Sequence, residues 1–200
     1  MEIPADSVSM REAYGLLISC IVPRPVAWVS TRSADGVANL APFSFFMGVG
    51  SKPPMLAVSV GHRHGSSKDT ARNIRETGEF VVNICTRSLA DRMVATSAEV
   101  GPEIDEFQLA GLTPIDSLAI QAPGVAESPI RMECRLHSIV DPAPNPVDLV
   151  LGEVIHFHLD DSILTDSLPD PMKLDPVARL GGSLYASLGE IFPIGRPDGG

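Results

Sequence analysis

A group of polar residues at positions 66–70 has the composition of an anion-binding site. Ser66, Ser67, Lys68, Asp69 and Thr70 combine hydroxyl groups and an ammonium at the expected start of a helix. The N-terminus of a helix offers unpaired backbone N–H groups and the positive end of the helix dipole, which together attract a phosphate. Lys68 would add charge, Thr70 or Ser67 a directed hydrogen bond, and Asp69 would point away from the anion. The alternative is that the cluster is an ordinary helix cap.

The segment Asn39–Phe46 has the composition of a slot for a flat heteroaromatic ring. It reads NLAPFSFF, so Ser44 lies among three phenylalanines, and Pro42 is expected to break the strand ladder. An interrupted strand frees backbone donors and acceptors for the polar edge of a ring, while the aromatic side chains supply an apolar wall. The alternative is a core strand with a bulge at the edge of a sheet.

Two arginines at distant positions are further candidates for contacting a ligand. Pro23 and Pro25 hold Arg24 in an extended loop, where its guanidinium is suited to a phosphate or a carboxylate substrate. Arg179 precedes a pair of glycines and Tyr185, which places a cation and a phenol around a turn. Trp28, the single tryptophan, is a candidate for stacking on a ring, with a core position as the alternative.

The histidines do not indicate a metal centre. His156 and His158 lie two apart and therefore share one face of a strand, but the sequence identifies no third ligand. A solvated or interface strand face is one interpretation, and a position of one histidine near a cofactor is the other. The sequence also contains no G-x-S-x-G, G-x-G-x-x-G or G-x-x-x-x-G-K-[ST] motif, so it does not predict a serine hydrolase, a Rossmann site or a P-loop.

Composition and charge limit the classes of protein and partner. The chain has 200 residues, 44% hydrophobic, and a formal net charge of −10, which disfavours a nucleic-acid surface. No apolar run is long enough to span a bilayer, and the N-terminus shows no secretory signal. Cys20, Cys85 and Cys134 are far apart and odd in number, which favours free thiols in a reducing compartment. We therefore expect a cytoplasmic protein with no membrane or nucleic-acid partner.

Short strands separated by turns dominate the expected secondary structure. Seventeen glycines and eighteen prolines punctuate the chain, and no βαβ alternation is present, which favours a closed or partly closed antiparallel barrel. A capping box at Ser9–Glu12 and a glycine at 78 mark helix ends. The helices are expected at 9–16, 67–78, 88–97 and 105–110. The strands are expected at 26–31, 37–40, 55–60, 80–85, 130–140 and 147–159, followed by a segment at 160–182 that wraps the surface.

Taken together, these segments resemble the flavin reductase-like, FMN-binding split-barrel family. The likeness spans nearly the whole chain in the family's order, and the set of motifs is specific although each alone is weak. It is carried by PRPVAWVST (23–31), DGVANLAPFSFF (35–46), the PP of SKPPM (51–55), KDTARNI (68–74), TGEFVVNI (77–84), DEFQLAGLTP (105–114), VAESPIRMECRL (125–136), LGEVIHFHLDD (151–161) and RLGGSLYA (179–186).

The resemblance implies a mainly β, Greek-key split barrel that holds FMN at the interface of a homodimer. One domain over 1–200 is expected, with 160–200 as an extension that wraps the barrel or the partner. The flavin edge would lie against Asn39–Phe46 and the phosphate near the helix start. The expected cofactor-binding residues are Arg24, Trp28, Ser30, Thr31, Asn39, Leu40, Ala41, Ser44, Phe45, Phe46, Lys68, Asp69 and Thr70. Those expected at the substrate entrance are Arg179, Tyr185 and His156.

The activity implied by the resemblance is transfer of a hydride from NADH or NADPH to FMN. Electrons would then pass to a flavin-using partner or a small acceptor. The flavin carries this chemistry, so no protein acid or base is required, and no catalytic residue is assigned. The alternatives are a nitroaromatic or related small-molecule reductase that keeps its FMN bound, and a flavoredoxin-like electron carrier that is not an enzyme. A more distant alternative on related barrels binds deazaflavin or haem.

Overall fold

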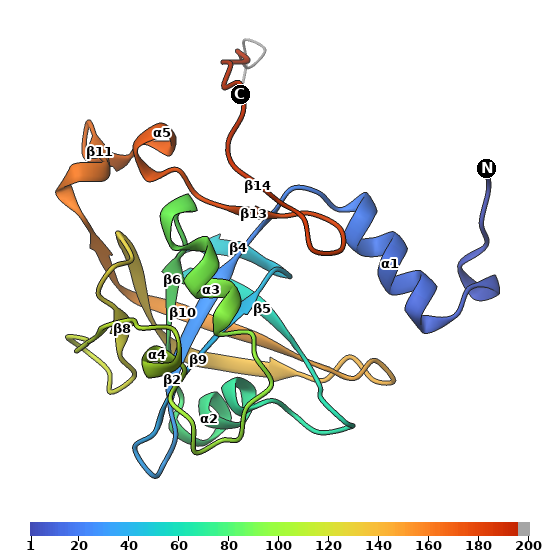
Figure 1. The fold of residues 1–200 in the computed structure, drawn as a ribbon, viewed down its shortest axis with the longest axis horizontal. Helices are drawn as coiled ribbons and strands as arrows, with labels where there is room; N and C mark the ends of the chain where they lie inside the picture. The colour runs from blue at the N-terminus through green and yellow to red at the C-terminus, as the bar shows by residue number, and fades with distance from the viewer. Residues whose placement is uncertain (196–200) are drawn as a thin grey trace.

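A computed structural model describes residues 1–195 and shows a curved antiparallel sheet of seven strands (Figure 1). The strand order is β3-β2-β6-β9-β10-β5-β4, and the sheet does not close between its edge strands β3 and β4. This is the split-barrel architecture that the sequence predicts. The seven strands are β2 (Ala27–Arg32), β3 (Ala38–Phe43), β4 (Phe46–Ser51), β5 (Pro54–Gly61), β6 (Glu79–Ile84), β9 (Ile130–Val140) and β10 (Val147–Leu159).

Both faces of the sheet are covered near β2. Ala27 and Val29 point into the core inside the barrel, together with Phe80 and Val150. Trp28, on the opposite face of the same strand, belongs to a second core under the helices. Because successive strand residues alternate between faces, almost every side chain of β2 is buried. β2 therefore forms a rigid base for the neighbouring strand β3.

β3 differs from its expected form because it continues through Pro42 instead of breaking there. Pro42 pairs with Trp28, and the strand ends at Phe43. An edge strand tolerates proline, because the missing N–H would have faced away from the sheet. β4, which follows directly as the opposite edge strand, was not expected. A close approach appears at Gly152 of β10, where a Cβ atom would lie 2.3 Å from Cζ of Phe80.

The helices begin largely where the sequence predicts, and two differ in length. α1 (Met10–Cys20) starts with the Ser9–Glu12 capping box but continues beyond 16 until the chain nears Pro23. The segment expected to be helical at 88–97 has a 3₁₀ turn at Arg87–Leu89 before α3 (Ala90–Ala95). α2 (Asp69–Thr77) ends at Gly78, which has a φ of 73°, and α4 (Glu106–Leu109) is a single short turn. No helix among residues 1–195 has the length and apolar composition needed to cross a membrane.

The segment from 160 to 195 contains only short elements. β13 (Ala178–Arg179) pairs with β1 (Arg24–Pro25) on one side and with β14 (Tyr185–Ala186) on the other. This small sheet lies beside the end of α1 (Figure 1). The extension predicted over 160–200 includes 196–200, which fall outside the described residues. The other short elements are η1 (Ala5–Ser7), β7 (Pro114–Ile115), β8 (Gly124–Val125), η3 (Asp161–Ile163), β11 (Leu164–Thr165), β12 (Leu168–Pro169) and α5 (Pro171–Leu174).

Candidate functional site

Two adjoining pockets lie along the edge strand β3. The first pocket, about 310 Å³, lies between β3, the start of α2 and the loop after α3. The second pocket, about 540 Å³, lies between the end of β3, α1 and the β13–β14 turn. Pro42, Phe43, Lys68 and Ser97 line both pockets, so the two form one continuous groove. Their volumes fall in the range typical of cofactor and substrate sites.

The start of α2 lacks a side-chain cap at the first pocket. Lys68 occupies the N-cap position and makes no side-chain capping hydrogen bond. The hydroxyl of Ser67, which the sequence offers as a cap, instead donates to Oδ2 of Asp148 at 2.7 Å. The first N–H groups of a helix have no partner within the helix, so an uncapped start leaves them available to a ligand. The ordinary-cap alternative does not describe this helix.

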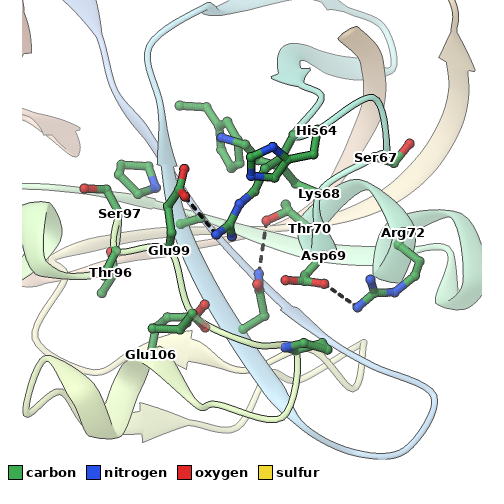
Figure 2. A pocket seen from close by; sticks show the side chains of 18 residues that line it. His64, Ser67, Lys68, Asp69, Thr70, Arg72, Thr96, Ser97, Glu99 and Glu106 are labelled. Carbon is green, nitrogen blue, oxygen red and sulfur yellow. Dashed lines mark hydrogen bonds and ion pairs between the residues drawn. The ribbon is translucent and has the colours of Figure 1, made fainter. Parts of the chain in front are cut away.

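The cations of the first pocket differ in how they are paired (Figure 2). Arg63 forms an ion pair with Glu99 at 2.9 Å, and Arg72 forms one with Asp69. Asp69 is therefore held by a neighbour on its own helix. Among the described residues, Lys68 has no carboxylate partner, and its Nζ lies 5.9 Å from the centroid of the Phe43 ring. Lys68 is the cation of this pocket that remains available to an anion.

A buried network of amides and hydroxyls fixes the wall of the first pocket. Nδ2 of Asn39 donates to Oγ1 of Thr31 at 3.2 Å and to Oγ1 of Thr70 at 3.1 Å. Asn73 donates to the same Thr31 oxygen at 3.0 Å. This network ties β2, β3 and α2 together, so Thr31 supports the pocket from behind while Asn39 and Thr70 line it.

Glu106 is a carboxyl at the first pocket that the sequence analysis did not identify. It is buried, and its Oε2 accepts the backbone N–H of Leu40 at 3.0 Å. Burial raises the pKa of Glu106 above its usual value, and the nearby Asp69 and Asp105 add to this effect. The sequence signal that could have found Glu106 is the motif DEFQLAGLTP (105–114), which includes it.

Asp148 orders the loop that leads into α2, and it too was missed. The side chain is 4% exposed and accepts hydrogen bonds from Ser67 and from Arg75, the latter at 2.8 Å. Nε2 of His62 lies 3.1 Å from Oδ2 of the same carboxylate. Burial raises the pKa of Asp148, but the hydrogen bonds and the charges of Arg75 and His62 outweigh it and lower the pKa.

The second pocket brings together both arginines of the sequence analysis. Arg24 is buried and donates to the carbonyl oxygens of Ile18 and Ile21, each at 2.6 Å, and to Leu180 O at 2.8 Å. Arg179 donates to the hydroxyl of Tyr185 and to Gly182 O, and its Cζ lies 4.5 Å from the Tyr185 ring centroid. Arg24 thus joins α1 to the C-terminal segment and also lines the pocket.

The structure collects most of the expected site residues and separates others from the groove. Asn39, Ala41, Asp69 and Thr70 line the first pocket; Arg24, Ser44, Phe45, Arg179 and Tyr185 line the second; Lys68 lines both. Other expected residues lie outside both pockets. Trp28 is in the core, where its Nε1 lies 2.9 Å from Oγ1 of Thr96, and the buried Ser30 hydroxyl donates to Pro123 O. Leu40 and Phe46 pack in the core. Thr31 lies behind the first pocket, and His156 stacks near His158 on β10.

The polar groups of the first pocket fit a phosphate. Within residues 1–195 no group of three or more His, Cys, Asp or Glu side chains is arranged to hold a metal. The donors around the helix start are one ammonium, a hydroxyl and backbone N–H groups, which are partners for a phosphate. The adjoining stretch of Ala41, Pro42 and Phe43 supplies the apolar surface that a flat ring needs.

Sequence comparison matches this chain to one domain family. The family model described as the flavin reductase-like domain matches residues 18–172. An uncharacterized protein of Halalkalibacterium halodurans is 39% identical over 205 residues, which covers 98% of this chain and 97% of the relative. The likeness therefore extends over essentially the full length of both chains.

Structure comparison gives the same grouping. Nitrilotriacetate monooxygenase component B from Bacillus cereus superposes with a TM-score of 0.93 at 39% identity and covers 97% of this chain and 98% of its own. The 2-nitrobenzoate 2-nitroreductase NbaA of Pseudomonas fluorescens superposes with a TM-score of 0.88 at 28% identity, with coverage of 99% and 97%. Both proteins share the arrangement of strands and helices described above.

Proposed function

This chain belongs to the flavin reductase-like family, and we propose that it is an FMN-dependent oxidoreductase that accepts hydride from NADH or NADPH. The observation that carries the proposal is the uncapped start of α2 beside the unpaired Lys68. This donor set suits the phosphate of FMN, which distinguishes FMN from riboflavin. The match to the flavin reductase-like domain over residues 18–172 supports a flavin cofactor.

The groove next to the phosphate site suits the remaining part of the cofactor. We propose that Lys68 and the N–H groups of α2 hold the phosphate and that β3 from Asn39 to Phe43 contacts the ring. Asn39 and Thr70 would keep this wall rigid through their hydrogen bond. When bound, FMN supplies hydride and single-electron chemistry, and the residues of the groove bind and orient it. The larger second pocket leaves room for the electron donor or acceptor that reacts with the bound FMN.

A second candidate function is reduction of a small nitroaromatic acceptor by tightly bound FMN. The likeness to the 2-nitrobenzoate 2-nitroreductase over nearly the full chain favours it. The two functions differ in whether reduced FMN leaves the protein. They share the cofactor site and the nicotinamide donor, so one set of measurements separates them.

We also propose that the protein works as a homodimer. α1 is eleven residues long and has no buried residue within one chain, although an isolated helix of this length is marginal in water. Met47, on the edge strand β4, is 60% exposed, and Phe157 of β10 is also exposed. We propose that the second copy covers α1 and these exposed apolar side chains. Sedimentation equilibrium tests the proposal, and a monomer at micromolar concentration would contradict it.

The three unpaired cysteines support a cytoplasmic location. Cys85 and Cys134 are buried, and Cys20 is exposed and free. Burial raises the pKa of the Cys85 thiol to about 12, which keeps it unreactive. An exposed free thiol persists best in a reducing compartment. Fractionation of the native cells tests this, and recovery outside the cytoplasm would contradict it.

The proposed activity is tested with purified protein, FMN and nicotinamide under nitrogen. We expect the protein to bind FMN and turn yellow, and we expect the yellow colour to disappear when NADH or NADPH reduces the flavin. If bound FMN is bleached by the nucleotide and its yellow colour returns when a nitroaromatic acceptor is added, while the FMN stays on the protein, the second candidate is identified. Steady oxidation of NADH only with added free FMN identifies flavin as a diffusing substrate. FMN that binds and is bleached by neither nucleotide would exclude a nicotinamide-dependent enzyme and indicate an electron carrier.

A further inference from the structure

Two arginines lie directly opposite each other in the small sheet of the second pocket. Arg24 of β1 and Arg179 of β13 are cross-strand partners, so their side chains leave the same face of the ladder. Like charges in directly opposite positions destabilise a strand pair. Arg24 is only 4% exposed, and within residues 1–195 neither arginine forms an ion pair. The repulsion is therefore not relieved by any described carboxylate.

The whole lining of the second pocket is free of acidic side chains among the described residues. It contains Arg24, Lys68 and Arg179, together with the aromatic rings of Tyr14 and Phe45. The chain as a whole has 25 acidic against 15 basic residues, so a lining with cations alone departs from the rest of the protein. Partly buried cations without counter-charges create a strong positive potential inside a cleft. Such a cleft selects an anion.

The hydrogen bonds of the two guanidinium groups show which donors remain. Arg24 donates through Nε to Ser44, through Nη1 to two carbonyl oxygens and through Nη2 to one more, which leaves a single N–H on Nη2. Arg179 donates only to Tyr185 and Gly182 within the described chain, so its Nε and one N–H on each Nη remain. Arg24 is thus fixed in place, and Arg179 retains the paired donors that suit a carboxylate.

We infer that the second pocket binds a planar organic anion, with its carboxylate on Arg179 and the remaining Nη2 of Arg24 and its ring beside Tyr14 and Phe45. The inference rests on the proposed function, because it names the substrate class of the same groove. The anion would neutralise the cross-strand arginine pair, so binding would also stabilise the small sheet. The phosphate of a nicotinamide nucleotide is a second anion that suits these arginines, and the experiment separates the two sources.

The test compares benzoate with its neutral isostere benzamide by calorimetry, both with FMN present and without it. We expect benzoate to bind at least about tenfold more tightly than benzamide, because a charge-assisted bidentate contact is lost in the amide. Arg179→Gln should remove this preference, and Arg179→Lys should restore part of it. Arg135→Gln, an exposed arginine on β9, is the matched control and should change neither affinity. The FMN affinity of each variant shows whether the groove is intact.

The outcomes separate this inference from the proposed function. Equal binding of benzoate and benzamide, or an unchanged preference in Arg179→Gln, would overturn the inference while FMN binding still stands. A preference for benzoate in protein that binds no FMN would support the anion site and overturn the flavin proposal. If Arg179→Gln raises the KM for NADH about tenfold and leaves benzoate unchanged, the anion belongs to the nicotinamide nucleotide and the carboxylate assignment is wrong.

Discussion

The two pockets of the groove treat charge in opposite ways. In the first pocket Arg63 and Arg72 are each paired with a carboxylate, and Lys68 alone remains free for a ligand. In the second pocket Arg24 and Arg179 face each other without a carboxylate among the described residues. In the first pocket the paired arginines leave one cation, Lys68, to bind a ligand. In the second pocket the two unpaired arginines favour binding of an anion that neutralises them. We therefore expect the first pocket to fix the cofactor and the second to select what meets it.

Replacement of Lys68 tests this comparison with the largest expected effect. Lys68→Ala should raise the Kd for FMN by roughly tenfold to a hundredfold, because a charge-assisted hydrogen bond contributes about 1.5–3 kcal/mol. Riboflavin lacks the phosphate, so its Kd should change little. Flavin fluorescence titrations measure both, and Lys52→Ala, an exposed lysine before β5, is the matched control. Equal losses for FMN and riboflavin would contradict a phosphate contact at Lys68.

The helix start of the first pocket could be predicted because one local segment supplies it. The run 66–70 contains the cation, the hydroxyls and the helix start, and α2 begins within it. The strands could also be predicted from local sequence, since β9 and β10 have the bounds that their apolar patterns indicate. The hydrogen-bond partner of Ser67 could not be predicted, because Asp148 is 81 residues away in the sequence and no local pattern relates the two residues.

The second pocket could not be predicted from local pattern, because distant segments assemble it. Arg24 and Arg179 were each singled out, but only the pairing of β1 with β13 makes them neighbours. Trp28 shows a different limit of sequence analysis, since an aromatic residue in a strand can line a ligand site or pack in the core. Here both faces of β2 are buried, so Trp28 packs in the core. Tertiary packing therefore contributes what periodicity alone cannot.

Asp148 offers a smaller effect that is confined to the first pocket. Asp148→Asn should lower the free energy of unfolding by about 1–2 kcal/mol at pH 7, because a buried acceptor of the Ser67 and Arg75 hydrogen bonds is weakened. Arg75 is half-exposed, so its ion pair contributes less than the Ser67 bond. The looser loop should also weaken FMN binding a few-fold, by roughly 0.5–1 kcal/mol. Benzoate binding in the second pocket should not change.

The pH dependence of this effect has a defined sign. The pKa of Asp148 is lowered in the folded protein, so its contribution to stability is present above the unfolded pKa of about 3.9. That contribution is lost as the pH falls through the lower folded value. Urea unfolding should therefore show that wild type and Asp148→Asn converge as the pH falls from 7 to about 3. Asp141→Asn, an exposed carboxylate, is the control, and a difference that grows on acidification would refute the assignment.

The smallest effect concerns how the second pocket orients its free arginine. The hydroxyl of Tyr185 accepts a hydrogen bond from Arg179, and the ring also lies against the guanidinium. Tyr185→Phe keeps the ring and removes the hydrogen bond, so benzoate affinity should fall by about twofold to fivefold, with FMN affinity unchanged. Arg135→Gln, which lies outside both pockets, is the control and should leave benzoate affinity unchanged. If Tyr185→Phe instead bound benzoate more tightly, the hydroxyl would be competing with the anion for Arg179, and Tyr185 would not be its positioning residue.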